Sequence, residues 1–180
     1  MKAFHIEAPQ FQNWRCQGCG DCCRGYHIVV VTADEKQRIQ SQGWTKADGI
    51  EPTKMVFPHG AKFRLAHKDN GECVFLDPEG RCRIHAKFGE QAKPLACRLY
   101  PYAIHPAGDK LVVSLRFSCP AAAANLGEPL TTQLQTLQRL AGLIVPPGFR
   151  TVQPPPILAK ATLAWPDFLR FIMRLDKTVA

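Results

Sequence analysis

The segment Cys16-Gln-Gly-Cys19-Gly-Asp-Cys22-Cys23 places four of the chain's eight cysteines within eight consecutive residues. Disulfides, a zinc ion, an iron–sulfur cluster and a reactive thiol centre could each explain such a density. The N-terminal sequence has no apolar core of the kind found in signal peptides, so we expect a cytoplasmic protein in a reducing compartment. Adjacent cysteines such as Cys22 and Cys23 also have poor geometry for a disulfide. Both observations favour metal ligation.

The other four cysteines follow at wider spacing and are Cys73, Cys82, Cys97 and Cys119. Two turn sequences, Asn70-Gly71 and Asp77-Pro-Glu-Gly80, lie beside Cys73 and Cys82. A turn between short extended arms would bring these two sulfurs to the same place. The sequence therefore predicts one set of eight thiols in the first two thirds of the chain.

The spacing of the cysteines indicates how the set could be divided. Two intervening residues suit a tight turn that directs two sulfurs at one metal atom or cluster. Adjacent residues seldom bind one zinc ion together, so we expect the eight sulfurs to be shared between sites. One partition joins the triplet C-x2-C-x2-C, typical of bacterial ferredoxins, with the cysteine that precedes Pro120. Its sets would be Cys16, Cys19, Cys22 and Cys119, and Cys23, Cys73, Cys82 and Cys97 with His85 as a spare or replacement ligand; other pairings stay open.

The sulfur donors do not by themselves distinguish zinc from an iron–sulfur cluster, because both accept thiolates. The ferredoxin-like triplet and the adjacent pair favour a cluster such as [4Fe–4S]. Two tetrahedral zinc ions are the alternative, and a metal that only stabilises a small loop-rich domain is another. We find no phosphate-binding loop, nucleophile elbow or dinucleotide fingerprint in the sequence.

The chain has a formal net charge of +8, which raises nucleic acid or an anionic membrane as a partner. However, no basic run is interleaved with aromatic residues, and the apolar stretches are too short to span a bilayer. We therefore expect neither partner. Metal-bound thiolates are negatively charged, so nearby cations could balance them instead of lying free in solvent. These cations are Arg81, Arg83, Lys87, Lys93 and Arg98, of which Arg98 could also donate a hydrogen bond to sulfur.

The pattern of apolar and turn residues predicts an α+β fold, a small loop-rich metal-binding domain over residues 1–125 with a helical C-terminal extension over 126–180 packed on it. The β-branched run 26–31 predicts a buried strand. Capping boxes at Thr32 and Thr45 predict two helices, the first ending near Gly43. Further strands are expected at 55–57, 63–65 and 111–117, and helices at 130–144 and from Trp165 onward.

Four segments together resemble a known family. They are CQGCGDCCRG (16–25), GECVFLDPEGRCRIH (71–85), KPLACRLYPY (93–102) and CP (119–120). This order is similar to the CxxCxxCC family of bacterial cysteine-cluster proteins, described as chelators of zinc or iron, which includes the flagellin lysine N-methylases. The resemblance covers roughly residues 14–120 and, as a match of several spaced motifs, is highly specific. It implies that all eight cysteines belong to the metal-chelating set, and that Pro94, Arg98 and Pro101 belong to the family pattern.

Three functions follow as hypotheses. The first is a metal-binding protein whose cysteines hold an iron–sulfur cluster or zinc. The second, implied by the resemblance, is metal-dependent methyl transfer to protein lysine, although those methylases are longer and no S-adenosylmethionine-binding pattern is visible here. The third is a metal carrier or redox sensor with labile thiols. A protein partner or substrate and the oligomeric state stay open.

Overall fold

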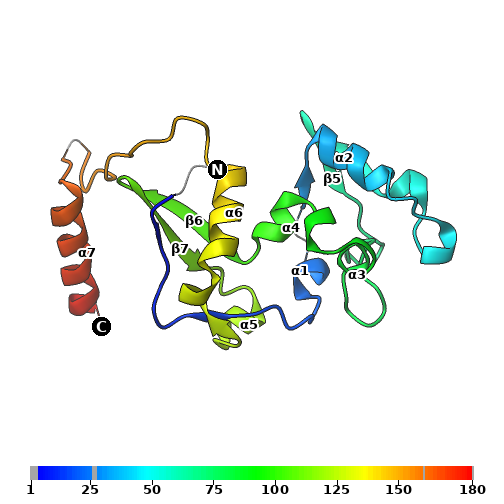
Figure 1. Cartoon of the computed structure of the whole chain (residues 1–180), viewed down its shortest axis with the longest axis horizontal. Coiled ribbons are helices and arrows are strands. Elements are labelled where there is room, and N and C mark those ends of the chain that lie inside the picture. The colour runs from blue at the N-terminus through cyan, green and yellow to red at the C-terminus, as the bar shows by residue number, and fades with distance from the viewer. Residues whose placement is uncertain (1–3, 26–27, 160, 180) are drawn as a thin grey trace. The chain divides into compact units, whose positions relative to one another are not determined.

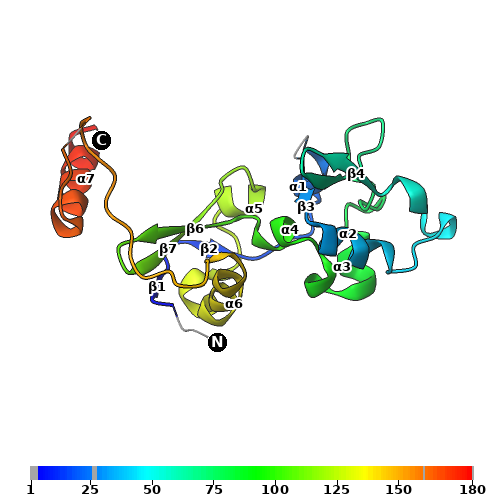
Figure 2. The same ribbon diagram turned by 90° about the horizontal axis from the view of Figure 1, so that it is seen from above.

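The computed structural model describes residues 4–25, 28–159 and 161–179, and its mixed helices and short strands confirm the α+β class. Figure 1 and Figure 2 show the chain from two directions. It divides into two compact units, each discontinuous in sequence. The first, which we call the cysteine unit, comprises Asn13–Pro101 and Arg116–Glu128, and the second, the sheet unit, comprises Met1–Gln12, Tyr102–Leu115 and Pro129–Ala180. All eight cysteines belong to the cysteine unit, and the predicted domain boundary near residue 125 stays a prediction.

The cysteine unit is built from short elements joined by turns. Its sheet has the order β3-β5-β4 with antiparallel neighbours, and β2 pairs with β8. The helices are α1 (Asp21–Arg24), α2 (Ala33–Gln40), η1 (Lys46–Asp48), η2 (Pro52–Lys54), α3 (Arg83–Phe88), η3 (Glu90–Ala92), α4 (Leu95–Leu99) and α5 (Pro120–Ala123). The strands are β2 (Asn13–Trp14), β3 (Val30–Val31), β4 (Val56–His59), β5 (Lys62–Leu65) and β8 (Glu128–Pro129).

Both predicted capping boxes are present. The Thr32 hydroxyl accepts the Glu35 N–H at 3.2 Å, and Glu35 Oε2 accepts the Thr32 N–H at 2.8 Å, so α2 begins where expected. The second carboxylate oxygen of Glu35 accepts the N–H of Leu95 at 2.7 Å, at the start of α4. A single buried side chain therefore caps α2 and ties it to α4. The predicted strand at 26–31 is shorter than expected, since β3 covers only Val30–Val31, and Tyr26 and His27 lie outside the described residues.

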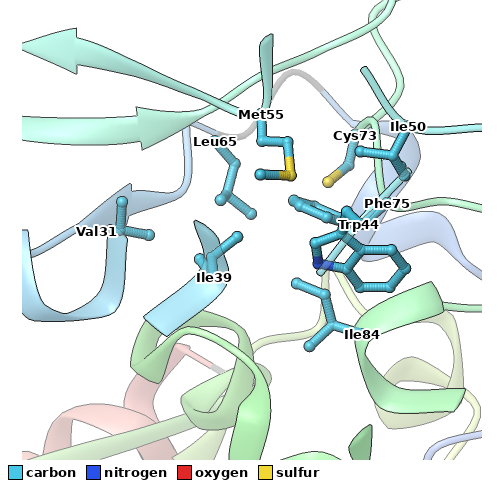
Figure 3. Packing of buried hydrophobic residues seen from close by; sticks show 9 residues of the cluster. All are labelled: Val31, Ile39, Trp44, Ile50, Met55, Leu65, Cys73, Phe75 and Ile84. Atoms are coloured by element: carbon cyan, nitrogen blue, oxygen red, sulfur yellow. The ribbon is translucent and has the colours of Figure 1, made fainter. Parts of the chain in front are cut away.

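A hydrophobic cluster forms the centre of this unit (Figure 3). The Trp44 and Phe75 rings lie 5.3 Å apart at their centroids, and Figure 3 shows them within a group of aliphatic side chains. Cys73 is part of this cluster and is 6% exposed. The buried members are Val31, Ile39, Trp44, Ile50, Met55, Leu65, Cys73, Phe75 and Ile84. One of the eight cysteines is thus fixed by apolar packing, independently of any ligand.

The sheet unit has longer and more regular elements. Its strands are β1 (Ile6–Glu7), β6 (Tyr102–Ala107) and β7 (Lys110–Leu115), in the order β1-β7-β6, and its helices are η4 (Leu130–Gln133), α6 (Leu134–Ile144) and α7 (Trp165–Val179). Strand β7 alternates half-buried and buried residues along its whole length, as expected for a strand with one covered face. Leu137, Leu140 and Ala141 are the buried residues of α6. The predicted strand at 111–117 and both C-terminal helices are confirmed.

Helix α7 is amphipathic, and Leu169, Ile172 and Leu175 are exposed. Its first residue is held at the β6–β7 turn, because Trp165 Nε1 donates to the Val152 carbonyl at 2.7 Å and the Val152 N–H donates to the Gly108 carbonyl at 3.0 Å. Among the described residues, no helix has the length and apolar character needed to cross a membrane.

Candidate metal centre

Five cysteines line one cavity of about 300 Å³ inside the cysteine unit. We call Cys22, Cys23, Cys73, Cys82 and Cys97 the cavity set. Apolar side chains, among them Val29, Leu65, Phe75 and Ile84, form much of the remaining wall, together with His67, Lys93, Tyr100, Arg116 and Ser118. All eight cysteines of the chain are unpaired thiols.

Backbone hydrogen bonds bring three members of the cavity set together. The Cys73 N–H donates to the Cys23 carbonyl at 2.8 Å, which joins the N-terminal motif to the middle of the chain. Leu76 and Cys82 then form an isolated antiparallel bridge across the turn at Asp77–Gly80, in which the Gly80 N–H donates to the Asp77 carbonyl at 3.1 Å. This confirms the expected turn between extended arms, and both Cys73 and Cys82 face the cavity.

The N-terminal loop packs closely against the same turn. Gly20 has φ +76° and precedes α1; a Cβ at this position would lie 2.5 Å from the Gly80 carbonyl oxygen. Only glycine accommodates both the left-handed conformation and this approach. Arg24 Nη1 donates to the Cys19 carbonyl, and Arg24 Nε lies 3.6 Å from Glu72 Oε1. The position of the loop is therefore set by contacts outside the cysteines themselves.

The remaining three cysteines, Cys16, Cys19 and Cys119, lie outside the cavity lining, and we call them the rim set. Cys16 and Cys19 are exposed, whereas Cys119 is buried at the start of α5. The segment that carries Cys119 is held beside the N-terminal motif, because the Arg15 N–H donates to the Leu126 carbonyl at 3.0 Å and β2 pairs with β8. Chain segments about a hundred residues apart thus meet at the rim.

The pKa shifts near the rim also show which thiols lie close to one another. A backbone hydrogen bond at Asp21 lowers the pKa of Cys19, but burial and the nearby Asp21 and Cys119 outweigh it, so the net shift is upward. Burial raises the pKa of Tyr100, and Cys119, Cys22 and Cys19 raise it further. Tyr100 therefore lines the cavity and also lies near two thiols of the rim set, Cys19 and Cys119, and its hydroxyl lies 3.2 Å from Ser118 Oγ.

Two thiols of the cavity set, Cys97 and Cys23, have raised pKa values. Burial raises the pKa of Cys97 to about 12, against the opposing effect of Lys93, and the neighbouring Cys23 and Cys82 add to the rise. For Cys23, the hydrogen bond with Cys22 lowers the pKa, but the hydrogen bond to Cys73 and burial raise it to about 12 overall. A metal bound here would displace these protons, because thiolates are the ligating form.

Cys22 and Cys23 occupy consecutive positions of α1, and their sulfurs lie 3.9 Å apart. Two sulfurs bound to one tetrahedral zinc at about 2.3 Å would be separated by about 3.8 Å. Adjacency in sequence therefore does not separate these two thiols in space. Cys22 lies at the junction of the cavity set and the rim set, since it lines the cavity and is also exposed, like Cys16 and Cys19 on the preceding loop.

The donor chemistry of this region fits a thiophilic metal or a cluster, because five sulfurs and no carboxylate line the cavity among the described residues. In the described part of the chain, no three His, Cys, Asp or Glu side chains are already grouped closely enough to hold an ion. Binding would therefore require rotation of the cysteine side chains on a backbone that already brings them to one cavity.

Most of the cationic side chains that were expected near the thiols do not line the cavity. Arg81 pairs with Asp77 at 3.2 Å and Lys87 with Asp48 at 2.8 Å, and only Lys93 of the five lines the cavity. Arg98 Nη2 donates to Gln91 Oε1 at 3.2 Å; its buried Nε, like that of Arg83, has no hydrogen-bond partner among the described residues.

The sequence did not predict that Arg116 and His67 line the cavity, and His85, which it offered as a ligand, does not line it. Arg116 lines the cavity together with Ser118, from the segment that follows β7. His85, the spare ligand, is exposed on α3 and is not among the lining residues, whereas His67 is. His67 pairs with Cys73 in an isolated antiparallel bridge, and this pairing cannot be read from either segment of the sequence alone.

Comparison with known proteins places these features in a family. Over 134 residues the chain is 27% identical to the flagellar biosynthetic protein FliU of Salmonella muenchen, covering 70% of this chain and 79% of FliU. Over the same length it is 27% identical to a lysine-N-methylase of Salmonella typhimurium, of which it spans only 33%. An uncharacterised protein of Methanocaldococcus jannaschii is 32% identical over 93 residues, covering 51% of this chain and 30% of that protein.

No solved structure matches the chain significantly. A family model described as "CxxCxxCC: Putative zinc- or iron-chelating domain" matches residues 15–120, which include all eight cysteines and most of the cysteine unit. The chain belongs to the CxxCxxCC family of zinc- or iron-chelating cysteine domains.

Proposed function

We propose that the cysteine unit is a metal centre in which all eight cysteines are ligands, divided between a cavity site and a rim site. The observation that carries this proposal is the convergence of five thiols, from three separate parts of the chain, on one cavity. Cys23, Cys73, Cys82 and Cys97 would hold the inner group, and Cys16, Cys19 and Cys119, with Cys22 at the junction, the outer one.

We favour an iron–sulfur cluster in the cavity, with zinc as the alternative. The ferredoxin-like spacing supports a cluster. The cavity of about 300 Å³ has room for either group, so its size does not separate them. When bound, such a group would supply redox or Lewis-acid chemistry; a zinc ion would mainly stabilise the fold.

Two cationic side chains line the cavity, and their charge suits either a zinc ion or an iron–sulfur cluster. Four thiolates around Zn²⁺, or around a [4Fe–4S]²⁺ core, leave a net charge of about −2. Lys93 and Arg116 both line the cavity and have no carboxylate partner among the described residues' ion pairs. Lys93 already lowers the pKa of the Cys97 thiol against the effect of burial. These side chains would offset the charge of the bound group.

Anaerobic purification followed by metal analysis and an absorption spectrum tests whether the cysteine unit binds an iron–sulfur cluster or zinc. A brown protein with iron, inorganic sulfide and broad absorption near about 400 nm is the expected result for cysteine-ligated iron. A colourless protein with two stoichiometric zinc ions would replace the cluster by zinc. A protein that binds neither metal after reconstitution would overturn the metal centre itself.

The division into two sites is tested with matched cysteine variants. Cys19→Ala removes an exposed rim thiol, and Cys82→Ala removes a half-buried cavity thiol. We expect each variant to lose only the metal of its own site, measured as metal per protein. Equal loss of all metal from both variants would instead indicate a single shared centre.

A second candidate function is methyl transfer to protein lysine, which only the named similarity to lysine-N-methylases supports. The chain covers 33% of these relatives, so residues supplied elsewhere in them have no counterpart here. Calorimetric titration of the metal-loaded protein with S-adenosylmethionine provides the test. Absence of binding would leave metal binding without methyl transfer.

A further inference from the structure

Two thiols of the rim set, Cys16 and Cys19, are exposed to solvent, and this exposure points to a use for the outer site. We propose that the rim set is an exchangeable metal site that passes a thiophilic cation directly to the cysteine thiolates of an acceptor protein, while the cavity site keeps its metal. This inference rests on the proposed two-site metal centre.

Exposure carries the first step. Cys16, Cys19 and Cys22 are exposed, whereas Cys23, Cys82 and Cys97 are half-buried and Cys73 and Cys119 are buried. Gly18, between Cys16 and Cys19, has φ +69°, and a Cβ placed there would meet no atom within 4 Å. An incoming thiolate can therefore approach this loop without displacing other parts of the cysteine unit.

The number of ligands carries the second step. Cys16, Cys19 and Cys119 supply three sulfurs, one fewer than tetrahedral zinc requires. The fourth ligand would be Cys22, whose sulfur also lies 3.9 Å from Cys23 at the edge of the cavity. Release of Cys22 toward Cys23 would leave one coordination position for an acceptor thiolate, with the ion still held by three cysteines.

The backbone around the rim carries the third step, because it holds the ligands in place while the ion is exchanged. The segment with Cys119 is anchored by the Arg15 N–H to Leu126 hydrogen bond at 3.0 Å and by the Asn13 N–H to Asn125 Oδ1 hydrogen bond at 2.7 Å. On the other side, Arg24 donates to the Cys19 carbonyl. The backbone that carries the rim cysteines would thus stay in place after the ion leaves.

Exchange of this kind balances without any oxidant or reductant. Each new bond from the ion to an acceptor sulfur replaces one bond to a rim sulfur, and the cation keeps its charge throughout. An acceptor thiol loses its proton as it binds, and the released cysteine thiolate takes up a proton from solvent. The acceptor is therefore a protein with at least two cysteines at metal-binding spacing.

The test uses full-length protein whose rim is loaded with isotopically enriched zinc-67, mixed with an apo zinc-finger peptide. Samples are separated and analysed by mass spectrometry over time. We expect the zinc-67 of the rim to move to the peptide, at a rate proportional to peptide concentration. The cavity metal should stay with the protein for at least tenfold longer.

Two variants test whether the rapid transfer of zinc to the peptide comes from the rim site. Cys19→Ala should abolish it, and Leu158→Ala, at an exposed residue of the sheet unit, should leave its rate within twofold of the unaltered protein. A rate independent of peptide concentration would overturn direct exchange, because release into solvent would then limit transfer. Retention of both metals, or their release in one phase, would overturn the exchangeable rim while leaving the metal centre standing; a protein that holds no metal would overturn both.

Discussion

The cysteine unit and the sheet unit of this chain are stabilised by different means. In the sheet unit, β6 and β7 pair in register over six residues each, from Tyr102↔Leu115 to Ala107↔Lys110. In the cysteine unit the strands are two to four residues long. Short strands supply few ladder hydrogen bonds and little covered surface, so this unit depends on its aromatic cluster and, we propose, on metal.

The comparison shows that the regular strand pairing and the candidate metal ligands lie in different units. The sheet unit has no cysteine in its sequence and is built on regular pairing. The cysteine unit replaces regular pairing with turns, which lets distant segments converge on one cavity. The predictions below challenge this contrast, from the largest expected effect to the smallest.

Removal of the metal should have the largest effect, and only on one unit. Structural zinc contributes about 10–16 kcal/mol to small zinc-dependent peptides, more than any single side chain discussed here. We expect chelation to increase amide hydrogen exchange in segments 15–25 and 73–99, while β6 and β7 keep their protection. Hydrogen exchange with mass spectrometry measures both in one sample. Equal loss of protection in the two units would contradict the contrast.

Truncation of the aromatic core should be the next largest effect. Phe75 is 1% exposed and packs against Trp44, so Phe75→Ala leaves a cavity and should cost about 3–5 kcal/mol in the free energy of unfolding of the cysteine unit. Urea unfolding of the metal-loaded protein measures it. Phe117→Ala is the matched control, because Phe117 is 61% exposed; we expect it to stay within about 0.5 kcal/mol. Similar costs for the two variants would show that the cluster does not support this unit.

A pair of glycine variants tests the packing of the N-terminal loop. Gly20 and Gly18 have φ +76° and +69°, but only at Gly20 would a Cβ collide with backbone, at 2.5 Å from the Gly80 oxygen. A left-handed non-glycine residue costs about 1–3 kcal/mol by itself. Gly18→Ala should therefore show this cost alone. Gly20→Ala should exceed it and also weaken metal binding by at least tenfold, measured by competition with a chelator; equal affinities would rule out a positioning role for this approach.

The smallest expected effect is the pH dependence of a surface contact. Hydrogen bonds from Lys87 and Thr45 lower the pKa of Asp48 to about 2. A depressed carboxyl pKa stabilises the fold above the unfolded pKa of about 3.9, and this stabilisation is lost as the pH falls from there through about 2. Asp48→Asn should flatten the acid limb of the stability curve slightly. Identical acid limbs for the variant and the unaltered protein would show that the contact does not contribute.

Local signals in the sequence predicted many individual elements. The Thr32 capping box determined the start of α2, and the leucine spacing after Leu130 determined α6, because both depend on residues within one or two helical turns. The turn at Asp77–Gly80 was equally predictable, and with it the approach of Cys73 and Cys82. The strand at 26–31 was predicted too long, since propensity alone does not tell how many residues find a pairing partner; β3 has one in β5.

By itself, the sequence determined which atoms are available for the chemistry: eight thiols, their spacing and the turns between them. Only the tertiary structure decided that five of these thiols share a cavity with Lys93 and Arg116, that His67 and not His85 lines it, and that Cys119 returns to the N-terminal loop. Ligand type and turn chemistry are local properties of the chain. Proximity between segments up to about a hundred residues apart depends instead on backbone pairing and core packing, which no local pattern encodes.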